Sequence, residues 1–219
     1  MKLLLPLALI FSISSFASTT QTMSDEVSDD MLVNIANKII NNSVEEVSER
    51  DLRKEIIAHP KRLLPRIKMA RLLITKDKFY QATAFLRRGV YYNQEDWRGW
   101  YWLGTSYLVS DDLKHANKSM DVAIKISKDN IYPIMQKALI LQESKKWAES
   151  LTFLKHALRK YPNNPIILLN IGYSAEMNSN VELMAQAYER FLQATEGNLK
   201  YSETRAIVLE VIGGRSDRQ

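Results

Sequence analysis

Three histidines, His59, His115 and His156, are the side chains here that most readily bind metals or move protons. Histidines that share a zinc ion on a helix are typically four residues apart, and no two of these have that spacing. In the repeat pattern described below, His115 and His156 occupy outward or flanking positions on helices, and His59 lies in a connection. We therefore expect ordinary surface histidines and no metal site.

Nucleophilic serines and paired carboxylates are the next candidates for chemistry. The sequence has no Gly-x-Ser-x-Gly elbow, no P-loop and no glycine-rich dinucleotide turn, the motifs that hold a nucleophile or a phosphate on a backbone turn. The acidic pairs at 45–46 and 111–112 fall at predicted turns or helix starts, which explains them without acid–base chemistry. We predict no catalytic residue, no metal and no cofactor, and a protein that is not an enzyme.

A small residue returns every 34 positions, and this spacing predicts the elements that carry these side chains. The four positions are Ala70, Gly104, Ala138 and Gly172. The clearest copy reads Trp100-x-x-Leu103-Gly104-x-x-Tyr107, followed by Ala116, Met120 and Ala123. This period and this pattern resemble those of the tetratricopeptide repeat (TPR).

The resemblance implies an all-α fold, an α-solenoid of stacked helix-turn-helix units. Four units of two antiparallel helices are expected at residues 63–96, 97–130, 131–164 and 165–198. A C-terminal capping helix is expected at 199–212 and a disordered tail at 213–219. Three positions depart from the family pattern: Lys137 stands where leucine is usual, and Ser150 and Met184 stand where alanine is usual.

Residues 29–62 resemble the repeat only loosely. Leu32, Ile35, Ala36 and Ile39 match its first helix, whereas the second half of the segment matches poorly. Two interpretations remain open: a degenerate TPR unit, and N-terminal helices that cap the array without repeating it.

The first 17 residues are similar to a secretory signal peptide. Lys2 precedes an apolar run, and Ser15-Phe16-Ala17 forms a small-x-small cleavage site. An uncleaved anchor is the alternative, but the run is shorter than the roughly 20 residues that cross a bilayer. The chain has no cysteine, which excludes a lipid anchor at the cleavage site and disulfides. We expect an exported bacterial protein of the periplasm, or secondarily a secreted one, with a flexible leader at 18–28 and no stable membrane insertion.

The net charge of +5 comes from lysines and arginines interspersed with acids, so it does not indicate nucleic-acid binding. In the TPR family the first helix of each unit lines a concave groove. Carried over position by position, the resemblance implies that the groove residues are Ile67, Arg71, Ile74, Arg98, Tyr101, Thr105, Leu108, Tyr132, Met135, Leu139, Gln142, Leu169, Tyr173 and Glu176.

This predicted groove is mostly apolar and aromatic, which suits an amphipathic helix or an extended peptide. The lysine and asparagine set with which some family members hold a terminal carboxylate is absent from it. Trp100 is expected in the core, and Tyr101 or Trp102 is expected to line the concave surface or contact the next helix pair. Alternatively, the leader or the N-terminal helices cover part of the groove.

These features favour a non-enzymatic periplasmic scaffold or adaptor that binds a protein or peptide. Family analogy points to the assembly of an envelope machine such as a pilus or a secretion apparatus. The alternative is a helper that presents an exported client, for example an apocytochrome, to a maturation complex. A homodimer could form through the stripe of Ala206, Leu209 and Ile212 on the predicted capping helix.

Overall fold

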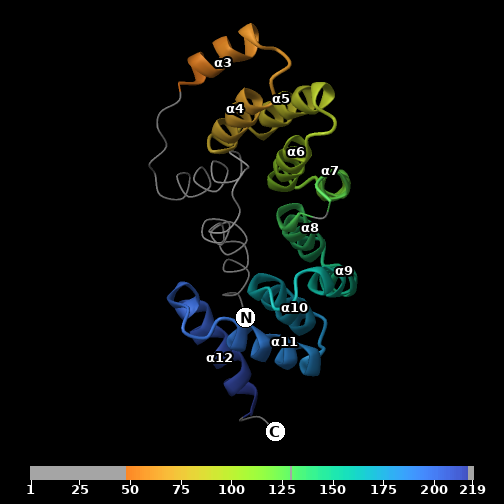
Figure 1. Ribbon diagram of the computed structural model, residues 1–219, viewed down its shortest axis with the longest axis vertical. Helices are drawn as coiled ribbons and strands as arrows, with labels where there is room; N and C mark the ends of the chain where they lie inside the picture. The colour runs from red at the N-terminus through yellow and green to blue at the C-terminus, as the bar shows by residue number, and fades with distance from the viewer. Residues whose placement is uncertain (1–47, 129, 217–219) are drawn as a thin grey trace. The chain divides into compact units, whose positions relative to one another are not determined.

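The computed structural model describes residues 48–128 and 130–216, in two compact units whose described parts are 48–144 and 145–216 (Figure 1). All regular elements in these ranges are helices, and the predicted all-α solenoid of helix pairs is confirmed. The predicted signal peptide, the leader, the part of the N-terminal region before residue 48 and the last three residues lie outside the described residues.

The unit at 48–144 begins with α3, which spans Glu49–Ala58 and packs on α4. Two helix pairs and one further helix follow: α4 (Leu64–Ile74), α5 (Phe79–Tyr92), α6 (Trp97–Val109), α7 (Leu113–Ile126) and α8 (Ile131–Glu143). Successive helices pack on each other, and α6 also contacts α4 and α8. The first helices of the repeats therefore form one layer, with α5 and α7 in a second layer (Figure 1).

The unit at 145–216 contains α9 (Trp147–Lys160), α10 (Pro165–Met177), α11 (Val181–Ala194), a short 3₁₀ helix η2 (Leu199–Tyr201) and α12 (Ser202–Ser216). Here α10 packs against both α9 and α11, and α12 contacts α11.

A single turn geometry recurs at the 34-residue period. Asp77, Asp111, Lys145 and Ser179 all have positive φ, between 56° and 62°. Backbone N–H groups beyond three of these turns donate to a carbonyl five residues back, from Lys78 to Leu73, Asp112 to Tyr107 and Asn180 to Ala175, at 2.8–2.9 Å. A left-handed residue with this bond satisfies the free carbonyls at a helix end and reverses the chain. The same backbone conformation thus recurs every 34 residues, in step with the sequence repeat.

Short polar side chains cap five of the described repeat helices, α6, α7, α8, α10 and α11. Asp96, Asp112, Asn130, Asn164 and Asn180 each accept a hydrogen bond from a backbone N–H two or three residues later. These bonds satisfy N–H groups that have no partner within the helix, and each stabilises its helix by about 1 kcal/mol.

Gly104 and Gly172 lie where the facing second helix leaves little room for a Cβ. A Cβ on Gly104 would lie 2.6 Å from Met120 Cε and 3.2 Å from the carbonyl oxygen of Ala116. A Cβ on Gly172 would overlap the aromatic ring of Tyr188, which is fully buried. The side chains of the second helices fill the space that these glycines leave, which is the close packing that the small residue of the repeat permits.

Each departure from the family pattern has a local explanation. Lys137 forms an ion pair with Asp121 across α7 and α8. The hydroxyl of Ser150 is 3.0 Å from that of Ser174 on α10, within hydrogen-bond distance, and Met184 is buried in the packing of α11. Lys137 and Ser150 thus have specific polar partners, whereas Met184 contributes apolar packing.

The C-terminal segment differs from the prediction of a helix at 199–212 followed by a disordered tail from 213. A 3₁₀ turn comes first, and α12 then continues to Ser216 through both glycines. Tyr201 packs edge-to-face on Phe191 with the ring centroids 5.8 Å apart, and Arg205 Nη1 donates to Thr195 Oγ1 at 2.9 Å. These contacts hold the segment on α11, and the α12 backbone hydrogen bonds carry the helix past residue 212.

No helix within 48–128 and 130–216 combines the length and the apolar character that crossing a membrane requires.

Replacing Gly172 with alanine should destabilise the protein by about 1–3 kcal/mol, because the added methyl group displaces the Tyr188 ring from a close-packed site. Urea unfolding monitored by circular dichroism measures the effect. Gly213→Ala is the matched control, because a Cβ there meets nothing within 4 Å. That control should leave stability unchanged or raise it by up to about 1 kcal/mol. Equal midpoints for the two variants would contradict the packing argument.

Candidate protein-binding face

The first helices α4, α6 and α8 lie next to each other in the unit at 48–144. We call the side of these helices that carries Arg71, Ile74, Tyr101, Thr105 and Tyr132 the first-helix face. Its five residues belong to the predicted groove and all lie within this one unit.

Arg71 on α4 is the most unusual residue of this face. Only 5% of it is exposed, and its guanidinium carbon lies 4.9 Å from the centre of the Trp102 ring on α6. Its Nε and Nη2 atoms have no hydrogen-bond acceptor among the described residues. Burial lowers the pKa of Arg71 to about 10, while the neighbouring Tyr101 acts in the opposite direction. A cation stacked on an aromatic ring, with two donors still unsatisfied, favours a site that attracts an anion.

Tyr101 connects the three helices of the face. Its ring packs edge-on against Trp97 and Trp102, with centroids 6.2 and 5.5 Å away. Burial raises the pKa of the Tyr101 phenol, Tyr132 on α8 adds to this effect, and the charge of Arg71 opposes it. Tyr101 is therefore close enough to Arg71 and to Tyr132, which the sequence placed in the same groove from two other repeats, for both to affect its pKa.

The structure buries much of the predicted groove set. Seven of the fourteen residues are buried: Ile67, Arg71, Met135, Leu139, Gln142, Leu169 and Tyr173. The other seven are half-buried: Ile74, Arg98, Tyr101, Thr105, Leu108, Tyr132 and Glu176. Ile67 belongs to the hydrophobic core, and Tyr101 and Leu108 pack against the core cluster formed by α7 and α8. Several predicted lining residues therefore also hold the helices together.

Arg98 has a local role at the start of α6. Its Nε and Nη2 donate to the two carboxylate oxygens of Asp96 at 2.9 and 2.7 Å, and Asp96 also caps the helix. The Arg98 side chain is thus held at the start of its own helix by the capping residue.

In the unit at 145–216, α10 carries the three predicted residues Leu169, Tyr173 and Glu176. The Tyr173 ring packs edge-on against Trp147, 5.9 Å between centroids. The Tyr188 hydroxyl donates to Glu176 Oε2 at 3.3 Å. Leu169 and Tyr173 are buried. These two predicted groove residues of α10 therefore lie inside the packed helices, next to aromatic side chains.

The side chains considered first for chemistry are not brought together. His59 and His156 are exposed, and His115 Nδ1 lies 2.7 Å from Asp112 Oδ2 with its ring 5.2 Å from that of Tyr107. The described residues contain no group of three or more histidines and acids that could hold a metal ion.

Trp102 is the residue of this face that the groove assignment missed. Its indole packs against the core, stacks with Arg71, and its Nε1 has no hydrogen-bond acceptor among the described residues. By contrast, Trp100 packs against the same core and donates from Nε1 to the Gln94 carbonyl at 2.9 Å. The sequence feature that pointed to Trp102 was the run of aromatic residues at 100–102. That run left Tyr101 and Trp102 as alternatives for the concave surface.

No protein-family model matches the sequence, and no curated protein matches it. Solved structures match the fold. The crystal structure of MamA superposes with a TM-score of 0.64 at 14% identity, over 82% of this chain and 100% of that chain. The structure of YrrB, titled a TPR protein with an unusual peptide-binding site, has a TM-score of 0.56 at 15% identity, over 77% of this chain and 87% of that chain. The chain has a TPR fold.

Yeast Tom70 is a further structural neighbour of this chain, with a TM-score of 0.65 and 16% identity. The match spans 98% of this chain and 47% of Tom70. Identities this low establish the fold and leave the binding partner open. The family resemblance drawn from the 34-residue period is confirmed at the level of fold.

The raised pKa of Tyr101 should make stability fall at alkaline pH. Above about pH 10 the unfolded chain releases the phenol proton while the folded chain retains it, which favours unfolding by up to about 1.4 kcal/mol per pH unit. Tyr101→Phe removes the ionisable phenol, and with it this contribution to the pH dependence of stability. Thermal unfolding at pH 8 and pH 11 should therefore show a smaller loss of stability for Tyr101→Phe than for the unmodified protein. Equal losses would contradict a desolvated phenol at this position.

Proposed function

We propose that this TPR protein is a non-enzymatic adaptor that binds a protein or peptide with its first helices. The observation that carries the proposal is the cluster of Arg71, Trp102, Tyr101 and Tyr132 across α4, α6 and α8. Rigid aromatic side chains supply contact area at low cost in conformational entropy, and arginine and tyrosine are enriched where binding energy concentrates.

The unsatisfied donors of Arg71 and Trp102 add a chemical preference. A ligand that places an oxygen acceptor there would gain the hydrogen bonds that the folded chain lacks, whereas a purely apolar ligand would leave them unmade. We therefore propose an amphipathic polypeptide with at least one acidic side chain as the ligand class. The peptide-binding site named in the YrrB structure's title supports a polypeptide ligand by analogy of fold.

Location and biological setting form the second part of the proposal. The signal-like residues 1–17 support export to the periplasm, where the adaptor would help assemble an envelope machine such as a pilus or secretion apparatus. Presentation of an exported client such as an apocytochrome to a maturation complex is the alternative setting for the same binding activity.

Tyr101→Ala and Tyr173→Ala should each reduce partner binding at least about tenfold, which corresponds to about 1.4 kcal/mol or more. The immobilised protein would be incubated with a bacterial envelope extract, and the recovered proteins quantified by mass spectrometry. Tyr91→Ala is the matched control, because Tyr91 is 70% exposed and lies on the second helix α5. Recovery that is the same for all three variants would contradict binding through the first helices.

Export should leave a protein that begins at Ser18 in the periplasmic fraction. N-terminal sequencing of the protein after osmotic shock measures this, with Ala17→Glu as the variant that blocks cleavage at the small-x-small site. An unprocessed chain recovered only with the cytoplasmic fraction would contradict the periplasmic setting, without bearing on the binding face.

A further inference from the structure

An open cavity of about 380 Å³ lies between α3, α4 and α5, within the unit at 48–144. Its volume falls in the lower part of the range of small-molecule sites, roughly 300–1,000 Å³. Two arginines line it, Arg66 on α4 and Arg88 on α5. The other lining residues are apolar: Ile56, Ile57, Pro60, Ala84 and Phe85.

Arg66 is held rigidly at this cavity. Only 4% of it is exposed, and its stem passes beside Gly89 of α5, where a Cβ would lie 3.3 Å from Arg66 Cδ. Its Nη2 donates to the Pro60 carbonyl at 2.7 Å, whereas its Nε has no acceptor among the described residues. The guanidinium is therefore fixed in position while part of its hydrogen-bonding capacity is unused.

Arg88 brings a second positive charge close to the first. Burial lowers the pKa of Arg66, the charge of Arg88 lowers it further, and Tyr92 acts in the opposite direction. Within 48–128 and 130–216, neither arginine forms an ion pair with an acidic side chain. An anion that contacts both guanidinium groups would relieve their repulsion and supply the missing acceptors.

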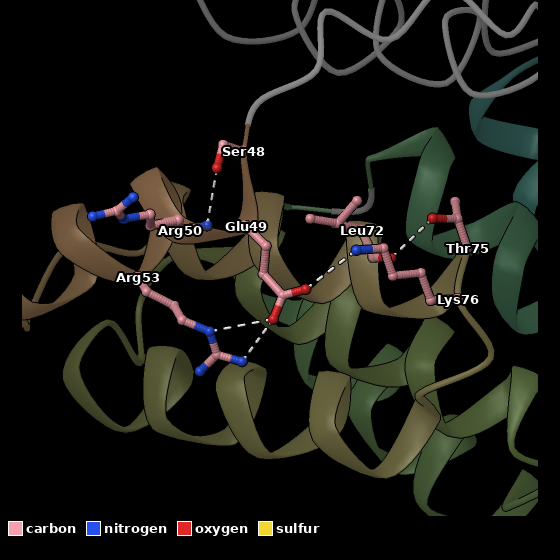
Figure 2. A network of polar contacts seen from close by, with 7 residues as sticks. All are labelled: Ser48, Glu49, Arg50, Arg53, Leu72, Thr75 and Lys76. Atoms are coloured by element: carbon pink, nitrogen blue, oxygen red, sulfur yellow. Dashed lines mark hydrogen bonds and ion pairs between the residues drawn. The ribbon is translucent and has the colours of Figure 1, made fainter.

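The acid at the start of α3 pairs with other cations. Glu49 Oε1 accepts from Arg53 Nη2 at 2.7 Å, and Glu49 Oε2 accepts from Lys76 Nζ at 3.2 Å (Figure 2). Figure 2 shows the carboxylate of Glu49 between these two side chains. Arg53, whose guanidinium carbon lies 5.9 Å from the centre of the Phe85 ring, is thus already neutralised, in contrast to Arg66.

The surrounding helices strengthen the attraction for an anion. Residues 48–92 carry 12 lysines and arginines and 4 acidic residues, a net charge of +8, whereas residues 93–219 carry 16 and 15, a net charge of +1. Nearly all the excess positive charge of residues 48–219 is therefore concentrated in the helices that form the cavity. Such a concentration of charge raises the local concentration of anions.

The chemistry of the lining restricts the rest of the ligand. None of the lining side chains can accept a hydrogen bond, because all are aliphatic, aromatic or arginine. A peptide would bury backbone N–H groups here without a side-chain acceptor, at a cost of about 1–3 kcal/mol each. An acyl chain has no such groups. Ile57, which is 79% exposed, extends the apolar wall towards the solvent.

We propose that this cavity binds an acyl carboxylate, with the carboxylate on Arg66 and Arg88 and the chain against Ile57 and Phe85. The site is separate from the first-helix face and does not rest on the proposed function. It would give this chain a small-molecule site in addition to its polypeptide-binding face.

Isothermal titration calorimetry of the full chain with sodium decanoate, below its micelle concentration, tests the proposal. We expect one saturable site per chain with a dissociation constant below about 1 mM. Butanoate, which has the carboxylate with a short chain, and decan-1-ol, which has the chain without the charge, should each bind at least about tenfold more weakly.

Variants of α5 place the ligand in the cavity. Arg88→Gln should weaken decanoate binding at least about tenfold. Arg87→Gln is the matched control, because Arg87 is the exposed neighbour on the same helix and does not line the cavity. Ala84→Trp, which fills the cavity and leaves every charge in place, should also weaken binding, whereas Gln81→Trp on the exposed surface of α5 should not. Circular dichroism of each variant verifies that the helices remain folded.

The absence of a saturable decanoate site would overturn the proposal. Equal losses in Arg88→Gln and Arg87→Gln would also overturn it, since binding would then reflect the general positive charge of the helices. Decan-1-ol that binds as tightly as decanoate would remove the role of the arginines. Tighter binding of acetyl-leucyl-leucine, which has one carboxylate and a peptide backbone, would show a polypeptide site in place of an acyl-chain site.

Discussion

The structure depends on the close approach of two helices at one small residue in each repeat. At Gly104 and Gly172 the facing side chains of Met120 and Tyr188 occupy the volume that a Cβ would need. At this separation the second helix packs along its whole buried stripe, and burial of about 25 cal/mol per Å² of apolar surface stabilises the pair. The side of the first helix that does not contact the second helix then points away from the pair. These sides of α4, α6 and α8 together form the first-helix face.

The same turn geometry joins the two helices within each repeat. The left-handed residues at 77, 111, 145 and 179 recur in register with the small residues, so each chain reversal begins at the same point of its repeat. Polar caps such as Asp96 and Asn164 begin first helices of the repeats, here α6 and α10. Because packing, turn and cap have the same period, a substitution can alter one copy, as Lys137 and Ser150 do, without shifting the register of the others.

The candidate face combines packing and recognition in the same side chains. Ile67, Met135 and Leu139 are buried, and Tyr101 contributes both to the core around α7 and α8 and to the surroundings of Arg71. In the proposed function, specificity comes from polar atoms that folding leaves unsatisfied, above all Nε and Nη2 of Arg71. A charged group retained in such surroundings lowers stability unless something pairs with it, and this is the physical basis for expecting an acidic ligand.

The sequence by itself determined the helix pairs, the turns between them and the TPR fold, because these features arise from contacts within about 34 residues and from residue types with strong local preferences. The fourteen groove residues stay a prediction: the repeat pattern places them by position, and position alone does not determine burial. Only the tertiary structure decided that Arg71 stacks on Trp102, that Arg98 is bound to Asp96, and that α12 continues past residue 212. The first and third outcomes depend on packing between neighbouring elements and the second on a side-chain rotamer, none of which the spacing of residues along the chain specifies.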